Sequence, residues 1–155
     1  NNELNKISLF LLNREKINID DVIKLTNLSE NYSISELADN CLSKNTKKIN
    51  KIFNENVFSL DDCILIVRTL LLKSKRLLEI KKIYNSNKNL EQIIANYKPP
   101  IFWKDKEIVK SQASKWSQKE AEKLIYRIHD TELLIKKNYY SSLNIVSDFI
   151  LNTSK

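Results

Sequence analysis

The only histidine is the first candidate for catalysis. His129 is followed by Asp130, and an Asp–His pair can activate a serine or cysteine nucleophile when the three side chains meet. The sequence places no serine or cysteine to complete such a triad. Cys41 and Cys63 have neither a CxxC pattern nor a histidine at the spacing of zinc ligands. We therefore predict that His129 is a surface or helix-packing residue and that the chain holds no metal.

Neither the acidic residues nor the glycine content of the sequence indicates another active site. Glu120, Glu122, Asp130 and Glu132 lie among lysines on one expected helix, where such residues form solvated ion pairs. A domain of 155 residues has about eleven glycines on average, and this chain has none. Phosphate-binding loops, dinucleotide fingerprints and the nucleophile elbow all need a residue without a Cβ atom. We therefore expect no catalysis, no cofactor and no binding or hydrolysis of ATP.

The basic residues favour binding rather than catalysis. The net charge is +7, and "KNTKKINK" at 44–51 contains four lysines and no acid. Between Lys98 and Lys137, ten lysines or arginines face six acids. A positive field of this kind favours nucleic acid or an acidic protein surface.

Tyrosines at one helix end are the best candidates for contact with a base. Tyr139 and Tyr140 follow Lys136 and Lys137, just before the last expected helix. An aromatic ring near basic residues can stack on an unpaired base for ~1–3 kcal/mol. Tyr139, Lys136 and Lys137 are therefore the candidates for DNA contact, and core packing of at least one tyrosine is the alternative.

Capping patterns predict where the helices that position these residues begin. A serine or asparagine followed three residues later by an acidic residue or glutamine can satisfy the free amides of a first helical turn. The matches are "SISE" (33–36), "SLDD" (59–62) and "SQKE" (117–120), with "NIDD" (18–21) and "NLEQ" (89–92) as weaker ones. No stretch predicts a strand. The expected helices are 2–12, 19–26, 34–43, 46–55, 60–85, 90–97, 104–115, 118–138 and 142–152.

Apolar spacing predicts an all-α helical bundle around the helix from Leu60. That helix is apolar almost all round in its middle, which is typical of a helix at the centre of a bundle. The helices from Gln118 and over 142–152 have apolar stripes of their own. The expected core residues are Cys63, Ile64, Leu65, Ile66, Val67, Leu70, Leu71, Leu72, Leu77, Leu78, Leu124, Ile125, Ile128, Leu134, Ile135, Leu143, Val146, Phe149 and Ile150.

Both prolines of the chain stand together in "NYKPPIFWKDK" (96–106). Pro99 and Pro100 cannot continue a helix, so the chain must turn there. We expect a structural loop whose Ile101, Phe102 and Trp103 enter the core, so that Trp103→Ala costs ~3–5 kcal/mol. The alternative is that Trp103 is exposed and recognises a peptide.

The order of these segments resembles one protein family. "INIDDV" (17–22), "SISELADNCLSKNTKKINKIF" (33–53), "ILIVRTLLLKSKRLLEIKK" (64–82), "PPIFWKDK" (99–106), "WSQKEAEKLI" (116–125) and "DTELLIKKNY" (130–139) together look like the C-terminal part of the delta subunit of bacterial DNA polymerase III, a clamp-loader component. Residues 1–27 are similar to the end of an AAA+ helical lid, and residues 28–155 resemble the helical collar domain.

The resemblance implies a role in DNA replication without catalysis. Collar domains associate side by side into a ring, so the implied partners are the other clamp-loader subunits of this nucleotidyltransferase holoenzyme, with primed DNA as a further one. The sliding clamp is gripped by the family's N-terminal domain, which the matching segments do not include. The resemblance places Tyr139 near the single-stranded template. The family's long helix is rich in arginine, and here Arg68, Lys73 and Arg76 are the basic candidates, although lysine lacks the bidentate fork of arginine.

Three further expectations concern the kind of protein. The runner-up function is a free-standing basic helical module that binds nucleic acid. Two cysteines form no disulfide framework, and "CILIVRTLLL" (63–72) is shorter than the ~20 residues of a membrane span, so we predict a cytoplasmic protein with no membrane partner. The chain begins with "NNELNK", inside a helical pattern, and we expect it to be the C-terminal part of a longer protein.

Overall fold

The computed structural model describes residues 8, 9, 11, 12, 18, 28–87 and 89–155. These residues contain helices and no strand, which confirms the all-α class. The expected helices over 2–12 and 19–26, the "NIDD" segment and the suggested lid over 1–27 fall almost entirely outside the described residues. From residue 28 onward the described helices are α3 (Leu28–Leu42), α4 (Thr46–Glu55), α5 (Leu60–Asn87), α6 (Leu90–Asn96), α7 (Lys106–Lys115), α8 (Gln118–Lys137) and α9 (Ser142–Thr153), with 3-10 turns at Trp103–Asp105 and Tyr139–Ser141.

Two predicted capping boxes start the two longest helices. The amide of Ser59 donates to Asp62 at 2.8 Å, and the amide of Asp62 donates back to the Ser59 hydroxyl at 3.2 Å. The same reciprocal pair joins Ser117 and Glu120, at 2.7 and 3.2 Å. The weaker match "NLEQ" is confirmed in part, because the side chain of Asn89 caps α6 by accepting from the amide of Gln92 at 3.1 Å.

The predicted start at Ser33 is wrong. Helix α3 begins at Leu28, so Ser33 lies inside the helix. Its hydroxyl donates to the side-chain oxygen of Asn56 at 2.7 Å. A partner 23 residues away in sequence therefore uses the hydroxyl that the local pattern assigned to a cap.

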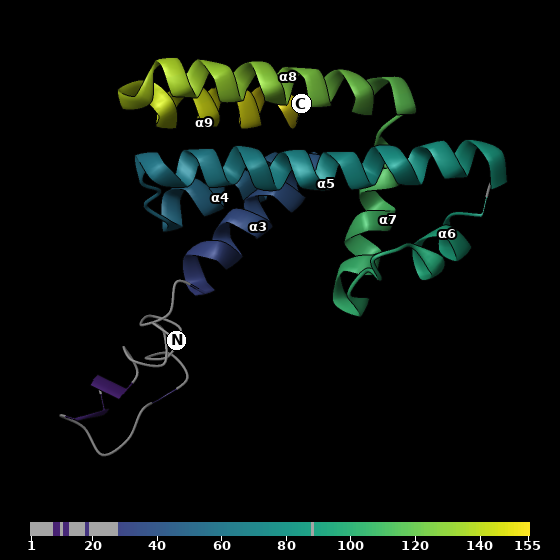
Figure 1. Ribbon diagram of the computed structural model, residues 1–155, viewed down its shortest axis with the longest axis horizontal. Coiled ribbons are helices and arrows are strands. Elements are labelled where there is room, and N and C mark those ends of the chain that lie inside the picture. Colours follow the sequence, from purple (N-terminus) through teal and green to yellow (C-terminus); the bar gives the residue numbers. More distant parts are fainter. Residues whose placement is uncertain (1–7, 10, 13–17, 19–27, 88) are drawn as a thin grey trace.

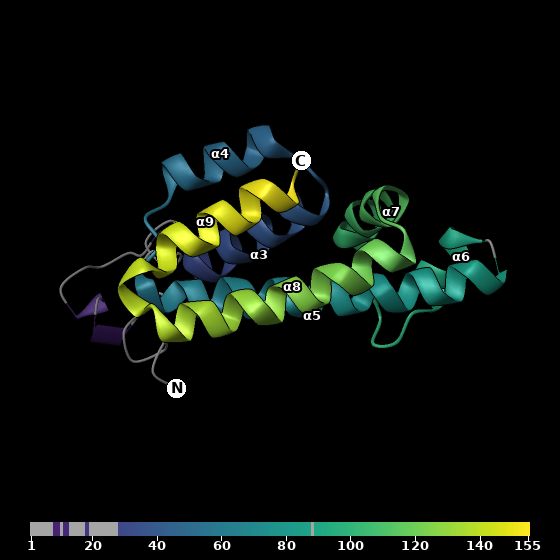
Figure 2. The same cartoon turned by 90° about the horizontal axis from the view of Figure 1, so that it is seen from above.

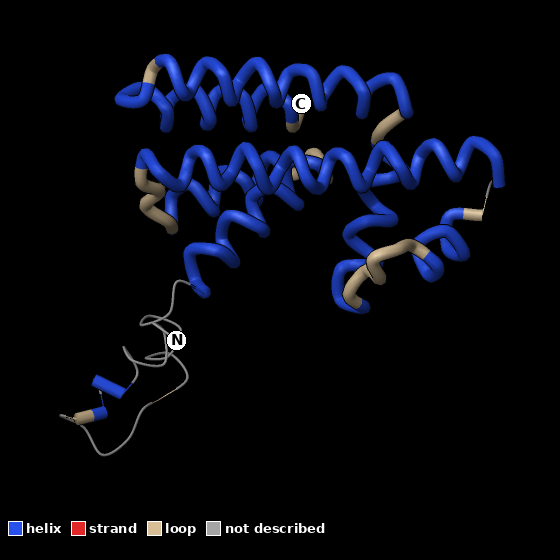
Figure 3. Tube along the Cα trace, viewed as in Figure 1, coloured by secondary structure: helices blue, strands red, loops and turns tan. Residues whose placement is uncertain are grey.

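Helix α5 is the longest of the described helices, with 28 residues, and α3, α6, α7, α8 and α9 pack against it, whereas α4 packs against α3. Helix α8 runs antiparallel beside α5, and α9 folds back along α8 (Figures 1 and 2). Helix α3 lies near the first half of α5 and carries α4, whereas α6 and α7 lie near the second half of α5 (Figures 1 and 2). Short loops join the helices from α3 onward (Figure 3). The molecule is thus two groups of short helices joined by the α5–α8 pair.

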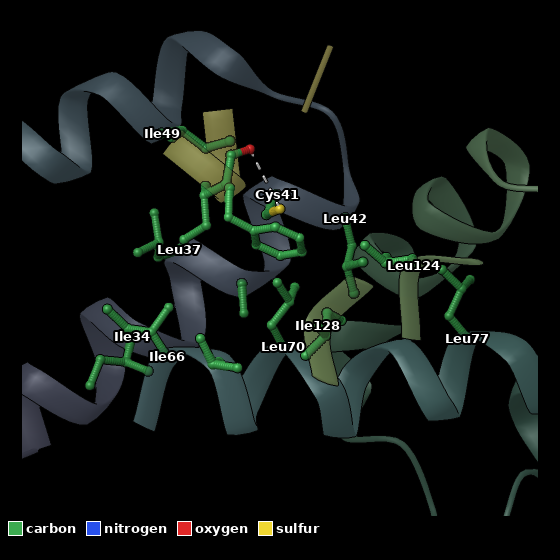
Figure 4. Close-up of a cluster of buried hydrophobic side chains, with 14 of the residues drawn as sticks. Ile34, Leu37, Cys41, Leu42, Ile49, Ile66, Leu70, Leu77, Leu124 and Ile128 are labelled. Atoms are coloured by element: carbon green, nitrogen blue, oxygen red, sulfur yellow. Dashed lines mark hydrogen bonds between the residues drawn. The ribbon is translucent and has the colours of Figure 1, made fainter. Parts of the chain in front are cut away.

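The core follows one side of α5 only. Leu37 and Leu42 of α3, Leu70 of α5 and Ile128 of α8 meet in one buried cluster (Figure 4). The expectation that α5 is buried almost all round is wrong, because Leu65 and Leu72 are exposed. Leu134 of α8 is exposed too. The buried residues of α5 and α8 are Cys63, Ile66, Val67, Leu70, Ser74, Leu77, Ile80, Ala121, Leu124, Ile128, Thr131 and Ile135.

A polar network connects α3, α5 and α7. The ammonium of Lys73 lies 2.5 Å from a carboxylate oxygen of Asp39 and donates to the carbonyl and hydroxyl oxygens of Ser35, at 3.1 and 2.8 Å. The buried side chain of Gln112 donates to the carbonyl and carboxylate of Asp39, at 3.2 and 3.1 Å. All these groups have lost most of their water, so each depends on the others for its hydrogen bonds.

The two tryptophans have opposite environments, and the expected one is not buried. Ile101 of the proline loop does enter the core, but Phe102 is 57% and Trp103 is 68% exposed. The prediction that both aromatic residues fill the core is therefore wrong. The reason is that Trp103 begins a 3-10 turn on the outside of the loop, while the interior is already occupied by Ile93, Ile94 and other aliphatic residues.

Trp116 is the tryptophan that the core uses. It is 7% exposed, and its indole N–H donates to the carbonyl of Leu42 at 2.7 Å. Lys115 donates to the carbonyl of Ser43, and the ammonium of Lys44 lies 4.8 Å from the centre of the Trp116 ring. Trp116 therefore both fills volume and satisfies a carbonyl that the end of α3 leaves free.

The two tryptophans provide a matched test of this packing. We expect Trp116→Ala to lower the free energy of unfolding by ~3–5 kcal/mol, the usual cost of truncating a large buried aromatic residue. The same change at exposed Trp103 is expected to cost less than ~1 kcal/mol. Urea denaturation followed by circular dichroism measures both. Equal losses for the two variants would contradict the assignment of Trp116 to the core.

The polar network has its own matched pair of lysines. Lys73→Ala leaves the carboxylate of Asp39 without its cation, so we expect a loss of about 2 kcal/mol of unfolding free energy. Lys75→Ala, on the exposed side of the same helix, is expected to change it by less than ~0.5 kcal/mol. Thermal denaturation of the two variants decides this, and a Lys73→Ala variant as stable as Lys75→Ala would show that the network adds nothing to stability.

Candidate functional site

The candidates for catalysis remain apart in the structure. His129 is exposed on α8, and the described residues contain no group of three or more His, Cys, Asp or Glu side chains that could hold a metal ion. Burial raises the pKa of Cys41 to about 12. Burial, and then the charge of Asp62, raise the pKa of Cys63 to about 11. Both thiols are therefore protonated near neutral pH and are poor nucleophiles.

The tyrosine pair, Tyr139 and Tyr140, lies in the turn between α8 and α9. The phenol of Tyr139 donates to a carboxylate oxygen of Asp61, in the first turn of α5, at 2.9 Å. This hydrogen bond raises the pKa of Tyr139. The two rings meet edge to face with centroids 5.7 Å apart. Tyr139 is half exposed, whereas Tyr140 is 91% exposed. The structure thus anchors the predicted residue and leaves its neighbour as the freer ring.

The two lysines predicted beside the tyrosines differ in their partners. Lys136 pairs with Glu132 at 2.8 Å, and Arg68 of α5 lies 3.8 Å from the same carboxylate oxygen. The hydrogen bond from Lys136, followed by the charges of Lys136 and Arg68, lowers the pKa of Glu132. Lys137 is exposed and forms no ion pair within the part of the chain that the structure describes. Two cations share one carboxylate here, so the surface keeps a positive charge.

The three basic candidates on α5 do not form one surface. Arg68 joins the cluster with Glu132 and Lys136. Lys73, another basic candidate, points into the polar network and pairs with Asp39. Arg76 is half-buried and borders a groove. Sequence spacing could not reveal this, because the partner of Lys73 comes from α3.

A groove runs between α5 and the proline loop, with a volume of about 770 Å³. Its apolar floor includes Leu71 and Leu72 of α5, and Pro99 and Pro100 form part of the opposite wall. Sequence analysis missed this groove because it assigned Leu72 and Phe102 to the core. We call it the α5 groove, and it is lined by Arg68, Leu71, Leu72, Lys75, Arg76 and Glu79 of α5, by residues 97–102, and by Asp105.

Helix α8 also presents large apolar side chains to solvent. Tyr126 and Leu133 are exposed and lie two turns apart on one face of the helix, with exposed His129 and Asp130 between them. Leu134 is exposed on an adjacent face, where it lines a groove between α8 and α9. We call Tyr126 and Leu133 the α8 outer face. Two large apolar residues exposed on the same face of one helix can serve as anchors for another protein.

The search for membrane-spanning helices and the comparisons with known proteins give no further information about the identity of the chain. None of the described helices combines the length and the apolar character that a membrane span requires. Comparison with known proteins matched the chain to no family model, no curated protein and no solved structure.

Proposed function

We propose that the chain is the helical collar part of a clamp-loader subunit similar to the delta subunit of bacterial DNA polymerase III. In this role it holds neighbouring subunits together during loading of the sliding clamp and catalyses nothing itself. The proposal is supported by the order of the six sequence segments that resemble the delta subunit. An all-helical architecture over residues 28–155, apart from residue 88, is compatible with it.

The observation on which the assembly role rests is the α8 outer face. A side face that binds another subunit must offer apolar area on a rigid element. Helix α8 has 20 residues and a capping box at its start, and its opposite side is buried against α5. Tyr126 and Leu133 therefore stay exposed, because the packing of α8 on α5 fixes which side of the helix faces outward.

Contact with primed DNA is a second part of the proposal and rests on the tyrosine pair. The ring of Tyr140 is largely exposed, and it contacts the ring of Tyr139 edge to face. Lys137 and the cluster of Arg68 and Lys136 supply positive charge nearby. Asp61, which holds Tyr139, reduces that field. The expected DNA contact is therefore a stacking contact at one point, supported by few phosphate contacts.

A free-standing nucleic-acid module is the second candidate function, and helix α4 favours it. Lys47, Lys48 and Lys51 are exposed on that helix, and Lys51 has only an exposed partner, Glu55, at 3.7 Å. Three lysines on one short helix can bind phosphates without any other subunit. The two candidates differ in whether the isolated chain binds nucleic acid tightly.

The assembly role predicts a specific sensitivity to changes on α8. We expect Tyr126→Ser combined with Leu133→Ser to weaken association with the other clamp-loader subunits by about tenfold or more, because apolar anchors dominate protein interfaces. Pull-down of the full-length protein with those subunits, quantified by titration, measures this. Lys119→Ser combined with Lys123→Ser is the control, because both lysines are exposed on the same helix and outside the α8 outer face. Equal binding of all three forms would rule out the α8 outer face as an interface.

If the tyrosine pair contacts DNA, changes at Tyr139 and Tyr140 should lower the affinity for primed DNA in proportion to how much of the ring is removed. We expect Tyr140→Ala and Tyr139→Ala each to weaken binding of the assembled clamp loader to primed DNA by ~1–2 kcal/mol, the scale of one stacked base. Tyr139→Phe keeps the ring, loses the hydrogen bond to Asp61, and is expected to change binding less than Tyr139→Ala. Fluorescence anisotropy at several salt concentrations measures these affinities.

Two results would redirect the proposal. If Tyr139→Ala breaks subunit assembly together with DNA binding, Tyr139 is a structural residue and has no separate DNA role. If the isolated chain binds single strands tightly at physiological salt, the free-standing module becomes the better account.

A further inference from the structure

We propose that the α5 groove binds an acidic segment of another protein, with large apolar side chains of that segment inserted between α5 and the proline loop. The proposal concerns a surface other than the α8 outer face and the tyrosine pair. It therefore does not depend on the collar role, and each can fail without the other.

The floor of the groove is suited to apolar side chains. Leu71 and Leu72 of α5 face Pro99, Pro100 and Phe102 across it. Leu72 is 68% exposed and Phe102 is more than half exposed, although both are large apolar residues. A concave surface of this composition, with a volume of about 770 Å³, matches the common form of a site for anchoring side chains.

The rim of the groove is positive. Four cations, Arg68, Lys75, Arg76 and Lys98, border it, against the two carboxylates of Glu79 and Asp105. Within the described part of the chain, Lys75, Arg76 and Lys98 form no ion pair, and Arg68 has only the long contact with Glu132. Unpaired cations around an apolar floor favour a partner that brings carboxylates together with apolar groups.

The groove is formed before any partner arrives. The phenol of Tyr97 donates to Glu79 at 2.5 Å, which connects the start of the loop to α5. Burial, and then this hydrogen bond, raise the pKa of Tyr97 to about 12, so the donor stays protonated at all physiological pH values. Ile101 holds the loop to the core on its other side. Preformed walls reduce the conformational entropy that binding would otherwise cost.

A peptide fits the groove better than a nucleic acid does. Bases bind to single-strand sites by stacking on aromatic rings, and the floor offers leucines and prolines, with Phe102 as its exposed ring. The positive rim attracts phosphates as well as carboxylates, so the apolar floor is the feature that favours a peptide. The ring of Trp103 packs on Phe102 with centroids 5.8 Å apart, so Trp103 stands next to the site and can report on it.

Fluorescence titration with defined peptides tests the proposal. The probes are short labelled synthetic peptides in which leucines and phenylalanines alternate with aspartates, in two registers. The controls are the same peptides with lysine in place of aspartate, the same peptides with serine in place of the apolar residues, and an oligothymidylate of similar length. We expect saturable binding of the acidic apolar peptides only. In a Trp116→Phe background, we also expect a change in the emission of Trp103 on binding.

Substitutions then locate the site. Leu72→Asp, which opposes the floor, and Lys75→Glu combined with Arg76→Glu, which reverses the rim, are each expected to weaken peptide binding about tenfold or more. Leu133→Asp on α8 is the matched control, since it adds the same charge at another exposed leucine. Circular dichroism confirms that each variant is folded, and because all these positions are exposed or half-buried, the fold is expected to survive.

The outcomes are distinct. Loss of binding in both groove variants but not in Leu133→Asp supports the proposal. Binding that all variants share, preference for the lysine or serine peptides, preference for the oligothymidylate, or no saturable binding by any acidic apolar peptide would each overturn it. None of these results changes the association expected at the α8 outer face.

Discussion

The antiparallel packing of α5 against α8 is the interaction on which the other features depend. Three contacts follow the pair from one end to the other: Asp61 with Tyr139, Arg68 with Glu132, and Asn85 with Gln118 at 2.8 Å. Between them lie the buried residues of both helices. These polar contacts are exposed and individually weak, so the apolar seam supplies the stability, and the polar contacts mark one register of the two helices.

That register determines what remains exposed. The sides of α5 that face α3, α8 and α9, and in its second half α6 and α7, are covered by neighbours. The remaining side carries Leu65, Arg68 and Leu72, and the proline loop crosses beside Leu72 to make a groove. On α8, the side opposite the seam carries the α8 outer face. The exposed apolar residues of both helices are thus a consequence of one packing geometry. In this geometry one face of each helix is buried, and the apolar residues on the opposite face remain exposed.

Local features were predictable from sequence, and contacts between distant segments were not. The starts of α5 and α8 followed from Ser59 and Ser117, because a capping box involves residues within one turn. Ser33 shows the same pattern, but its hydroxyl meets Asn56 in the folded chain. The apolar spacing of α5 predicted a buried helix and could not show which side lacks a neighbour. Trp116 is buried because its indole N–H meets the carbonyl of Leu42 at the end of α3, a contact between distant segments that the sequence around Trp103 and Trp116 could not show. Of the candidate sites, the tyrosine pair could be named from sequence because its two residues are adjacent, whereas the α5 groove joins segments that are far apart in sequence.

Arg68 borders the α5 groove and also contacts Glu132, which binds Lys136 near the tyrosine pair. A ligand in the groove could therefore influence the tyrosine pair through this chain of charges. The Arg68–Glu132 contact is 3.8 Å long, and the side chain of Arg68 is largely exposed, so its contribution is at most ~1 kcal/mol. Coupling between sites in regulated proteins is typically 1–3 kcal/mol and involves a change between two packed states. Here Glu132 keeps its shorter bond to Lys136 whether or not Arg68 moves away. The two surfaces of this domain are thus expected to act as independent contacts on one rigid pair of helices.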